Sequence, residues 1–155
     1  MMPDPTETNI HATAIVAGTL GILLVGSSGS GKSELGFRLI NEARQRGWFG
    51  ALVADDRVEL SRHGEALVAR RPETIAGMIE LRQGGIASVA SVRRAVLDLA
   101  ISPVGMTAER LPEENERHTV AFGLTLPLFR IPVHACAPLA MIEALTASRN
   151  DFKFA

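Results

Sequence analysis

The chain has 155 residues and a formal net charge of −1, with apolar residues making up 46% and charged residues 21%. A chain of this length and composition can bury a core, which excludes an intrinsically disordered protein. The near-neutral charge argues against a nucleic-acid-binding surface, which usually shows as clustered excess lysine and arginine. Since no charged and then apolar leader opens the chain and no apolar run approaches about 20 residues, we expect a cytoplasmic protein that does not cross a membrane.

Hydrophobic periodicity predicts strands and helices behind a polar arm over residues 1–8, and no repeat or linker divides the rest, so we expect one domain over 1–155. Two segments are harder to assign, a glycine-rich one over 74–89 and a charged surface one over 107–118. The elements expected in chain order are a strand over 9–18, an almost continuously apolar strand over 20–26, a helix from 33 to about 46, a strand over 49–56, a hairpin over 57–71 turning at His63-Gly64, a strand over 94–102, a proline-interrupted edge strand over 126–133 and a helix over 138–148.

The single cysteine, Cys136, cannot form an internal disulfide, which favours a reducing compartment. Its neighbours are mainly apolar, so we expect a buried and unreactive thiol rather than a nucleophile.

Residues 26–33 form a complete G-x-x-x-x-G-K-S phosphate loop between an apolar strand and a helix, which is the context that this motif requires. Its glycines allow backbone N–H groups to approach an anion, and the helix that follows directs its positive end at the same point. Lys32 supplies a charge for the β- and γ-phosphates, and the Ser33 hydroxyl is a ligand for Mg²⁺. We therefore expect a nucleoside triphosphate to be bound by Gly26, Ser27, Ser28, Gly29, Ser30, Gly31, Lys32 and Ser33.

An acidic pair, Asp55-Asp56, follows the next apolar segment. The helix between the loop and this pair fits a strand–helix–strand unit with two parallel strands close together, whose carboxyl ends would meet beside the phosphates. One carboxylate could hold Mg²⁺ through water, and the other could accept a proton from an attacking hydroxyl. Both acids can face a ligand only if the strand ends or bends there, and the alternative is that they begin a solvated turn.

Six segments form an ordered set of motifs: NIHATAI, GSSGSGKSEL, LVADDRVEL, MIELRQGGIAS, AERLP and IPVHACAPLAMIEAL. From about residue 9 to 147, the chain resembles the catalytic domain of HPr kinase/phosphorylase, an enzyme that transfers phosphate from ATP to a serine of the phosphocarrier HPr. The resemblance implies an α/β fold, a P-loop nucleotide-binding domain with a mixed sheet and flanking helices. It also implies ATP and Mg²⁺ as cofactors and a homo-oligomer, a hexamer in the family.

The same resemblance implies a role for each matched position. Without it, His11 would be an ordinary strand histidine and Arg110 a solvated arginine. Glu80 and Arg82 lie two apart and share a face if their segment is a strand, so they suit equally a metal ligand beside a cation or a surface ion pair. By resemblance, Lys32 binds the transferred phosphate, Ser33 and Glu80 hold Mg²⁺, Asp56 accepts the proton with support from Asp55, His11 lines the active site, and Arg110 stabilises phosphate charge or the partner.

Three features depart from the family pattern. Family members usually carry a separate N-terminal domain, which we expect this chain to lack. The last strand usually runs into a basic, glycine-containing turn tied to the reverse, dephosphorylating reaction, and here residues 134–138 read HACAP. Gln83-Gly84 also replaces a glycine and a hydrophobic residue in the signature. The sequence therefore favours kinase activity over phosphorylase activity.

The leading hypothesis is an ATP- and Mg²⁺-dependent kinase acting on a serine of HPr. A small-metabolite kinase is a second hypothesis, which the phosphate loop permits. A non-enzymatic ATP-sensing module is a third, and the intact Asp55-Asp56 pair argues against it because a sensor has less need of a base.

Overall fold

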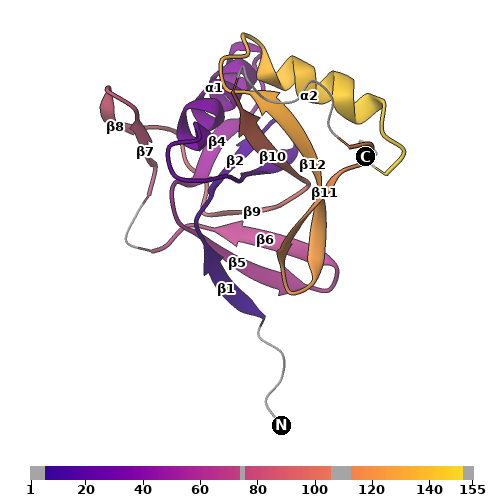
Figure 1. Cartoon of the computed structure of the whole chain (residues 1–155). Helices are drawn as coiled ribbons and strands as arrows, with labels where there is room; N and C mark the ends of the chain where they lie inside the picture. The colour runs from indigo at the N-terminus through magenta and orange to yellow at the C-terminus, as the bar shows by residue number, and fades with distance from the viewer. Residues whose placement is uncertain (1–5, 74–75, 106–112, 152–155) are drawn as a thin grey trace.

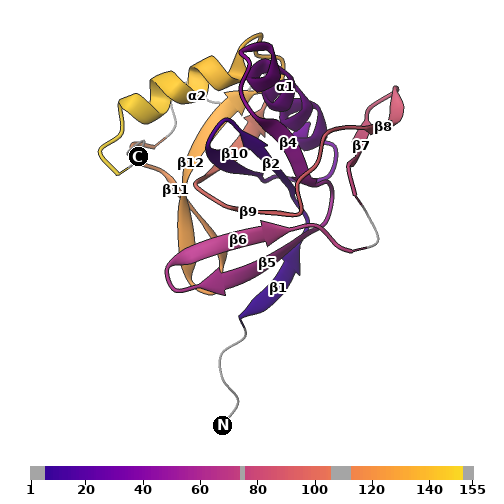
Figure 2. The same cartoon turned by 180° about the vertical axis from the view of Figure 1, so that it is seen from behind.

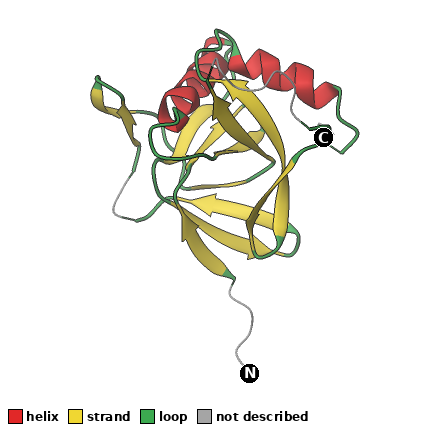
Figure 3. Cartoon of the chain, in the orientation of Figure 1, coloured by secondary structure: helices red, strands yellow, loops and turns green. Residues whose placement is uncertain are grey.

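A computed structural model describes residues 6–73, 76–105 and 113–151 (Figure 1). The helices of the described residues lie together on one side of a body made of strands, as the colouring in Figure 3 shows. In chain order the elements are β1 (Glu7–Ile10), β2 (Thr13–Ala17), β3 (Leu20–Leu24), α1 (Lys32–Gln45), β4 (Gly50–Ala54), β5 (Val58–His63), β6 (Ala66–Arg70), β7 (Met78–Leu81), β8 (Gly85–Ser88), β9 (Arg94–Val96), β10 (Leu99–Val104), β11 (Arg117–Ala121), β12 (Leu124–Pro132) and α2 (Pro138–Ala147).

The strands form a six-stranded mixed sheet in the order β11-β12-β10-β3-β2-β4, a four-stranded sheet in the order β1-β5-β6-β9, and a separate β7–β8 hairpin. The helices pack on one face of the six-stranded sheet, and the four-stranded sheet packs against the other. This arrangement confirms the predicted α/β fold with a mixed sheet and flanking helices. No helix in the described ranges has the length and apolar character needed to cross a membrane.

A hydrophobic core lies on each face of the six-stranded sheet, and β3 contributes side chains to both. Ile22 and Leu24 pack with the helices, whereas Leu23 faces the four-stranded sheet, because successive side chains point to opposite faces of a strand. A strand covered on both faces cannot show a polar alternation, which explains the continuous apolar run predicted to be a buried strand.

The predicted strand–helix–strand unit is correct in direction but not in adjacency. β3 and β4 both run antiparallel to β2, so they are parallel to each other, and β2 lies between them. The carboxyl ends of β3 and β4 still open on the same side of the sheet.

The single strand predicted over 9–18 is wrong, because the chain changes sheets at His11-Ala12. β1 pairs with β5 in the four-stranded sheet, and β2 pairs with β4 in the six-stranded sheet. The segment that pairs with it changes sheets in the same way, between β4 and β5. The two paired segments therefore bend together at one corner. The backbone N–H of Ala12 donates to the carbonyl of Asp56 across this corner.

The single strand predicted over 94–102 is also divided, into β9 and β10, which belong to different sheets. The break is held by two hydrogen bonds between Asp98 and Gly21. The Gly21 N–H donates to the Asp98 carboxylate at 2.8 Å, and the Asp98 N–H donates to the Gly21 carbonyl at 2.8 Å. Burial raises the pKa of the Asp98 carboxyl, and the hydrogen bond from Gly21 opposes this rise.

The prediction of an edge strand over 126–133 is wrong, because β12 lies between β11 and β10. Its prolines are tolerated because each part of β12 is paired on one side. Residues 124–127 pair with β11 and residues 128–132 with β10. β11, which covers the end of the charged segment, was not predicted.

Both predicted long helices are confirmed, with Pro138 in the first turn of α2. The Glu42 side chain of α1 accepts hydrogen bonds from the first backbone N–H groups of α2 at Leu139 and Ala140. The hairpin predicted over 57–71 is confirmed as β5 and β6. The prediction of a buried Cys136 is wrong, because this residue lies exposed in the loop between β12 and α2.

Candidate active site

The phosphate loop joins β3 to α1, as the motif predicts. Gly31 immediately precedes α1 with φ of 100°, a left-handed conformation that favours glycine. A Cβ at Gly31 would also lie 2.8 Å from a methyl carbon of Val133. Gly31 has no side chain with which to cap α1, so the first N–H groups of the helix face the loop as they do in anion sites.

Lys32 is buried, and its ammonium group directs its three donors at defined acceptors. These are the carbonyl of Gly26 at 2.9 Å, the carbonyl of Ser27 at 2.8 Å and Nε2 of His11 at 3.4 Å. Burial lowers the pKa of the Lys32 ammonium, and the charges of the two nearby aspartates act in the opposite direction. A phosphate group that contacts Lys32 must therefore replace one of these acceptors.

Asp56 lies just beyond the end of β4, where the strand bends. Its φ of 68° is a left-handed conformation that is uncommon outside glycine. Because the strand ends and bends here, both acids of the pair reach the site: Asp56 lines the cavity, and Asp55 accepts hydrogen bonds from two residues that line it. The Asp56 carboxylate lies 3.0 Å from Nδ1 of His11.

Asp55 is a hydrogen-bond acceptor at the base of the site. One carboxylate oxygen accepts from the Ser33 hydroxyl at 2.7 Å and from the fully buried Thr13 hydroxyl at 2.9 Å. The other accepts from the backbone N–H of Glu80 at 3.0 Å. Asp55 thus connects the phosphate loop, β2 and the β7–β8 hairpin.

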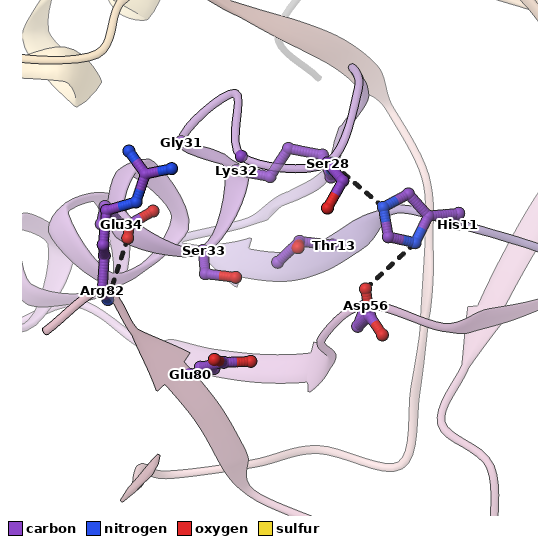
Figure 4. Close-up of a pocket in the computed structure, with 11 residues that line it drawn as sticks. His11, Thr13, Ser28, Gly31, Lys32, Ser33, Glu34, Asp56, Glu80 and Arg82 are labelled. Carbon is purple, nitrogen blue, oxygen red and sulfur yellow. Dashed lines mark hydrogen bonds and ion pairs between the residues drawn. The ribbon is translucent and has the colours of Figure 1, made fainter. Parts of the chain in front are cut away.

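A polar cavity of about 240 Å³ lies between these elements (Figure 4). Of the residues predicted for the site, Arg110 lies outside the described residues. Thr13 and Glu34 line the cavity and were not predicted, although the strand expected over 9–18 would place Thr13 on the same face as His11, and Glu34 follows Ser33 directly. The lining consists of His11, Thr13, Ser28, Gly29, Gly31, Lys32, Ser33, Glu34, Asp56, Glu80 and Arg82.

The residues present fit a magnesium-bound polyphosphate. No group of three or more His, Cys, Asp or Glu side chains in the described ranges could hold a metal by itself. Mg²⁺ at nucleotide sites needs only one or two protein oxygens, because phosphates and water supply the rest. The Ser33 hydroxyl and the Glu80 carboxylate can supply such oxygens. The Ser30 hydroxyl is buried in the loop without a hydrogen-bond partner among the described residues.

This combination of fold and loop defines a P-loop-type nucleotide-binding domain. The family model of the HPr serine kinase C-terminal domain matches residues 5–153, and the chain belongs to this family. The resemblance inferred from the motifs is therefore confirmed.

Individual relatives agree with this assignment. HPr kinase/phosphorylase from Bacillus pumilus is 31% identical over 94% of this chain and 49% of its own length. The protein of the same name from Streptococcus pyogenes serotype M1 is 34% identical over 95% of this chain and 49% of its own length. A solved structure of the Hpr(Ser) kinase/phosphatase from Coxiella burnetii superposes with a TM-score of 0.70 at 29% identity, covering 90% of this chain and 94% of that one. The chain spans about half the length of the curated relatives that it matches.

Proposed function

We propose that this chain is an ATP- and Mg²⁺-dependent kinase that phosphorylates a serine hydroxyl of HPr. The observation that carries the proposal is the continuous contact from Lys32 through His11 to Asp56, which joins the phosphate loop to a carboxylate on the same cavity. The family assignment supports HPr as the acceptor, and the phosphate loop supports a nucleoside triphosphate, which we take to be ATP, as the donor.

His11 orients the proposed base. Lys32 can only donate, so Nε2 of His11 accepts, and the proton of the neutral ring then lies on Nδ1, which is 3.0 Å from the Asp56 carboxylate. One Asp56 oxygen is then occupied by His11, and the other remains to accept the proton of an incoming serine hydroxyl. The Asp56 side chain is 79% exposed, so a serine on the surface of another protein can reach it.

In the proposed reaction the serine oxygen forms a bond to the γ-phosphorus and its proton passes to Asp56. The bond from the γ-phosphorus to the β–γ bridging oxygen breaks, and ADP leaves. Lys32 and the loop N–H groups stabilise the charge on the transferring group, which is the main source of rate acceleration in this chemistry. Mg²⁺, held by Ser33 and Glu80, would neutralise further phosphate charge.

A transfer assay tests the proposal. The purified protein is incubated with γ-labelled ATP, Mg²⁺ and HPr. We expect label on an HPr serine, its loss in Asp56→Asn, and its retention in Glu65→Ala, a control in the exposed β5–β6 turn. Label that passes only to a small molecule would support a metabolite kinase. Nucleotide binding without transfer would support an ATP sensor.

Two further parts of the proposal come from the family resemblance. The chain assembles into a homo-oligomer, a hexamer in the family, which light scattering tests. The kinase direction dominates, because residues 134–138 provide no lysine or arginine for inorganic phosphate. Release of inorganic phosphate from serine-phosphorylated HPr at a rate matching the forward reaction would contradict this second part.

A further inference from the structure

The β7–β8 hairpin carries Glu80 and Arg82 to the cavity, but its two strands pair only with each other. It projects from the body of the molecule in both views (Figures 1 and 2). Ile79 anchors it to the core among the helices. The end of β7 that faces the phosphate loop is held by hydrogen bonds from its backbone to two carboxylates, Asp55 and Glu34.

Glu34 lies in the first turn of α1, directly after Ser33. One of its carboxylate oxygens accepts the backbone N–H of Arg82 at 3.0 Å, across 48 residues of sequence. An acidic side chain in the first helical turn is ordinary by itself, but beside a bound polyphosphate it repels the ligand. The Glu34 carboxylate would therefore weaken phosphate binding unless another group offsets its repulsion.

The Arg82 side chain supplies a compensating charge. A Cβ built on Gly29 would lie 3.2 Å from a terminal guanidinium nitrogen of Arg82, so this group lies against the phosphate loop. Within the described ranges, no hydrogen bond or ion pair engages the guanidinium. Figure 4 shows Arg82 beside Glu34 at the edge of the cavity, with a dashed line for the hydrogen bond from the Arg82 backbone N–H to the Glu34 carboxylate. Its donors are free to form the bidentate contacts that arginine makes with phosphate.

We propose that Glu34 is a positioning residue that holds the Arg82 backbone, so that the Arg82 guanidinium contacts the bound phosphates as a second cation beside Lys32. This inference rests on the proposed function, because it concerns the same phosphate site. It assigns a task to a residue pair that the transfer mechanism above does not use.

Two readouts that need no phosphoryl transfer test the pair. Hydrogen exchange reports protection of the Arg82 amide, and calorimetric titration with inorganic pyrophosphate and Mg²⁺ reports phosphate binding. In Glu34→Ala we expect the Arg82 amide to exchange about tenfold faster or more and pyrophosphate to bind about tenfold more weakly. Glu34→Gln keeps an acceptor oxygen, so it should retain both the protection and the binding.

Arg82→Ala should weaken pyrophosphate binding about tenfold while keeping amide protection at position 82. Adding Glu34→Ala to Arg82→Ala should cause little further loss of binding, because Glu34 acts through Arg82. Arg94→Ala, an exposed arginine on β9, is the matched control and should bind as the unaltered protein does.

Unchanged amide protection in Glu34→Ala would overturn the proposal, as would unchanged binding in Arg82→Ala or no pyrophosphate binding by the unaltered protein. If HPr is not phosphorylated but these binding and exchange effects appear, the kinase proposal fails and the positioning role stands.

Discussion

His11 and Asp56 lie 3.0 Å apart because both occupy the corner where two paired segments pass from one sheet to the other. The bend brings an exposed histidine and an exposed aspartate together at the open end of the phosphate loop. Neither residue would face the cavity if its strand continued straight. The architecture of two sheets therefore creates the polar half of the site, and the loop creates the phosphate-binding half.

The strained backbone at Asp56 predicts a trade-off between stability and activity. Asp56→Gly should raise the free energy of unfolding by about 0.5–1 kcal/mol, because glycine adopts φ of 68° without steric cost. Asp56→Ala keeps the Cβ and should not be stabilised, and both variants should lose transfer to HPr. Urea unfolding measures the difference, and an alanine variant as stable as the glycine variant would rule out backbone strain at this position.

Removing the Asp55 carboxylate should lower the free energy of unfolding, because a buried hydroxyl loses its hydrogen-bond acceptor. Asp55→Ala removes the acceptor of the fully buried Thr13 hydroxyl, so unfolding should become easier by about 1–3 kcal/mol. Adding Thr13→Val should recover part of this loss, because the orphaned hydroxyl is removed. A double-mutant cycle by chemical denaturation tests the coupling, and simple additivity of the two changes would contradict it.

The contact between Gly21 and the β9–β10 junction predicts a site intolerant of any side chain. A Cβ at Gly21 would lie 1.8 Å from the carbonyl oxygen of Val96, so Gly21→Ala must displace a strand. We expect a loss of more than about 3 kcal/mol, or failure to fold. Gly84→Ala, whose Cβ would meet only ordinary contacts at 3.6 Å, is the control. A Gly21→Ala protein with an unchanged melting temperature would show that this junction is not tightly packed.

The ion pairs near the end of the described chain predict acid sensitivity. Hydrogen bonding from Arg130 lowers the pKa of the Glu116 carboxyl below its ordinary 4.5, and hydrogen bonding from Arg149 lowers the pKa of Asp151 below 3.8. Carboxyls with lowered folded pKa values stabilise the fold above their unfolded values, and this contribution disappears as the pH falls through the folded values.

Glu116→Gln should therefore melt at a lower temperature than the unaltered protein at pH 7. The difference between the two melting temperatures should shrink as the pH falls below 4.5. Scanning calorimetry across this range measures the convergence. Glu65→Gln, in the exposed β5–β6 turn, should have the same melting temperature as the unaltered protein at pH 7. If the difference in melting temperature between Glu116→Gln and the unaltered protein stays the same in acid, the ion pair is not its cause.

The phosphate loop and α1 could be predicted because their signals are local. Consecutive residues supply the glycines, the lysine and the helical periodicity, and no distant partner is needed to define them. The same holds for α2, whose first-turn proline and apolar spacing mark its start. The acidic pair was identified by its place after a buried strand.

The elements that were predicted wrongly depend on distant partners. Nothing within residues 9–18 or 94–102 shows that the chain changes sheets, because the change is set by pairing with β5 at one place and by the Gly21–Asp98 contacts at the other. The position of β12 inside the sheet depends on β11, and the exposure of Cys136 depends on how its loop lies against α1. Glu34 escaped prediction because its partner, the backbone of Arg82, is 48 residues away.

The most direct test of the account is a crystal structure with ADP, Mg²⁺ and aluminium fluoride, a mimic of the transferring phosphoryl group. We predict that Lys32 donates to a fluoride at about 3 Å in place of one of its present acceptors, and that an Asp56 oxygen accepts a hydrogen bond from the water that lies in line on the side opposite ADP. A complex in which Asp56 points away from the mimic, or in which Lys32 makes no contact with it, would contradict the account.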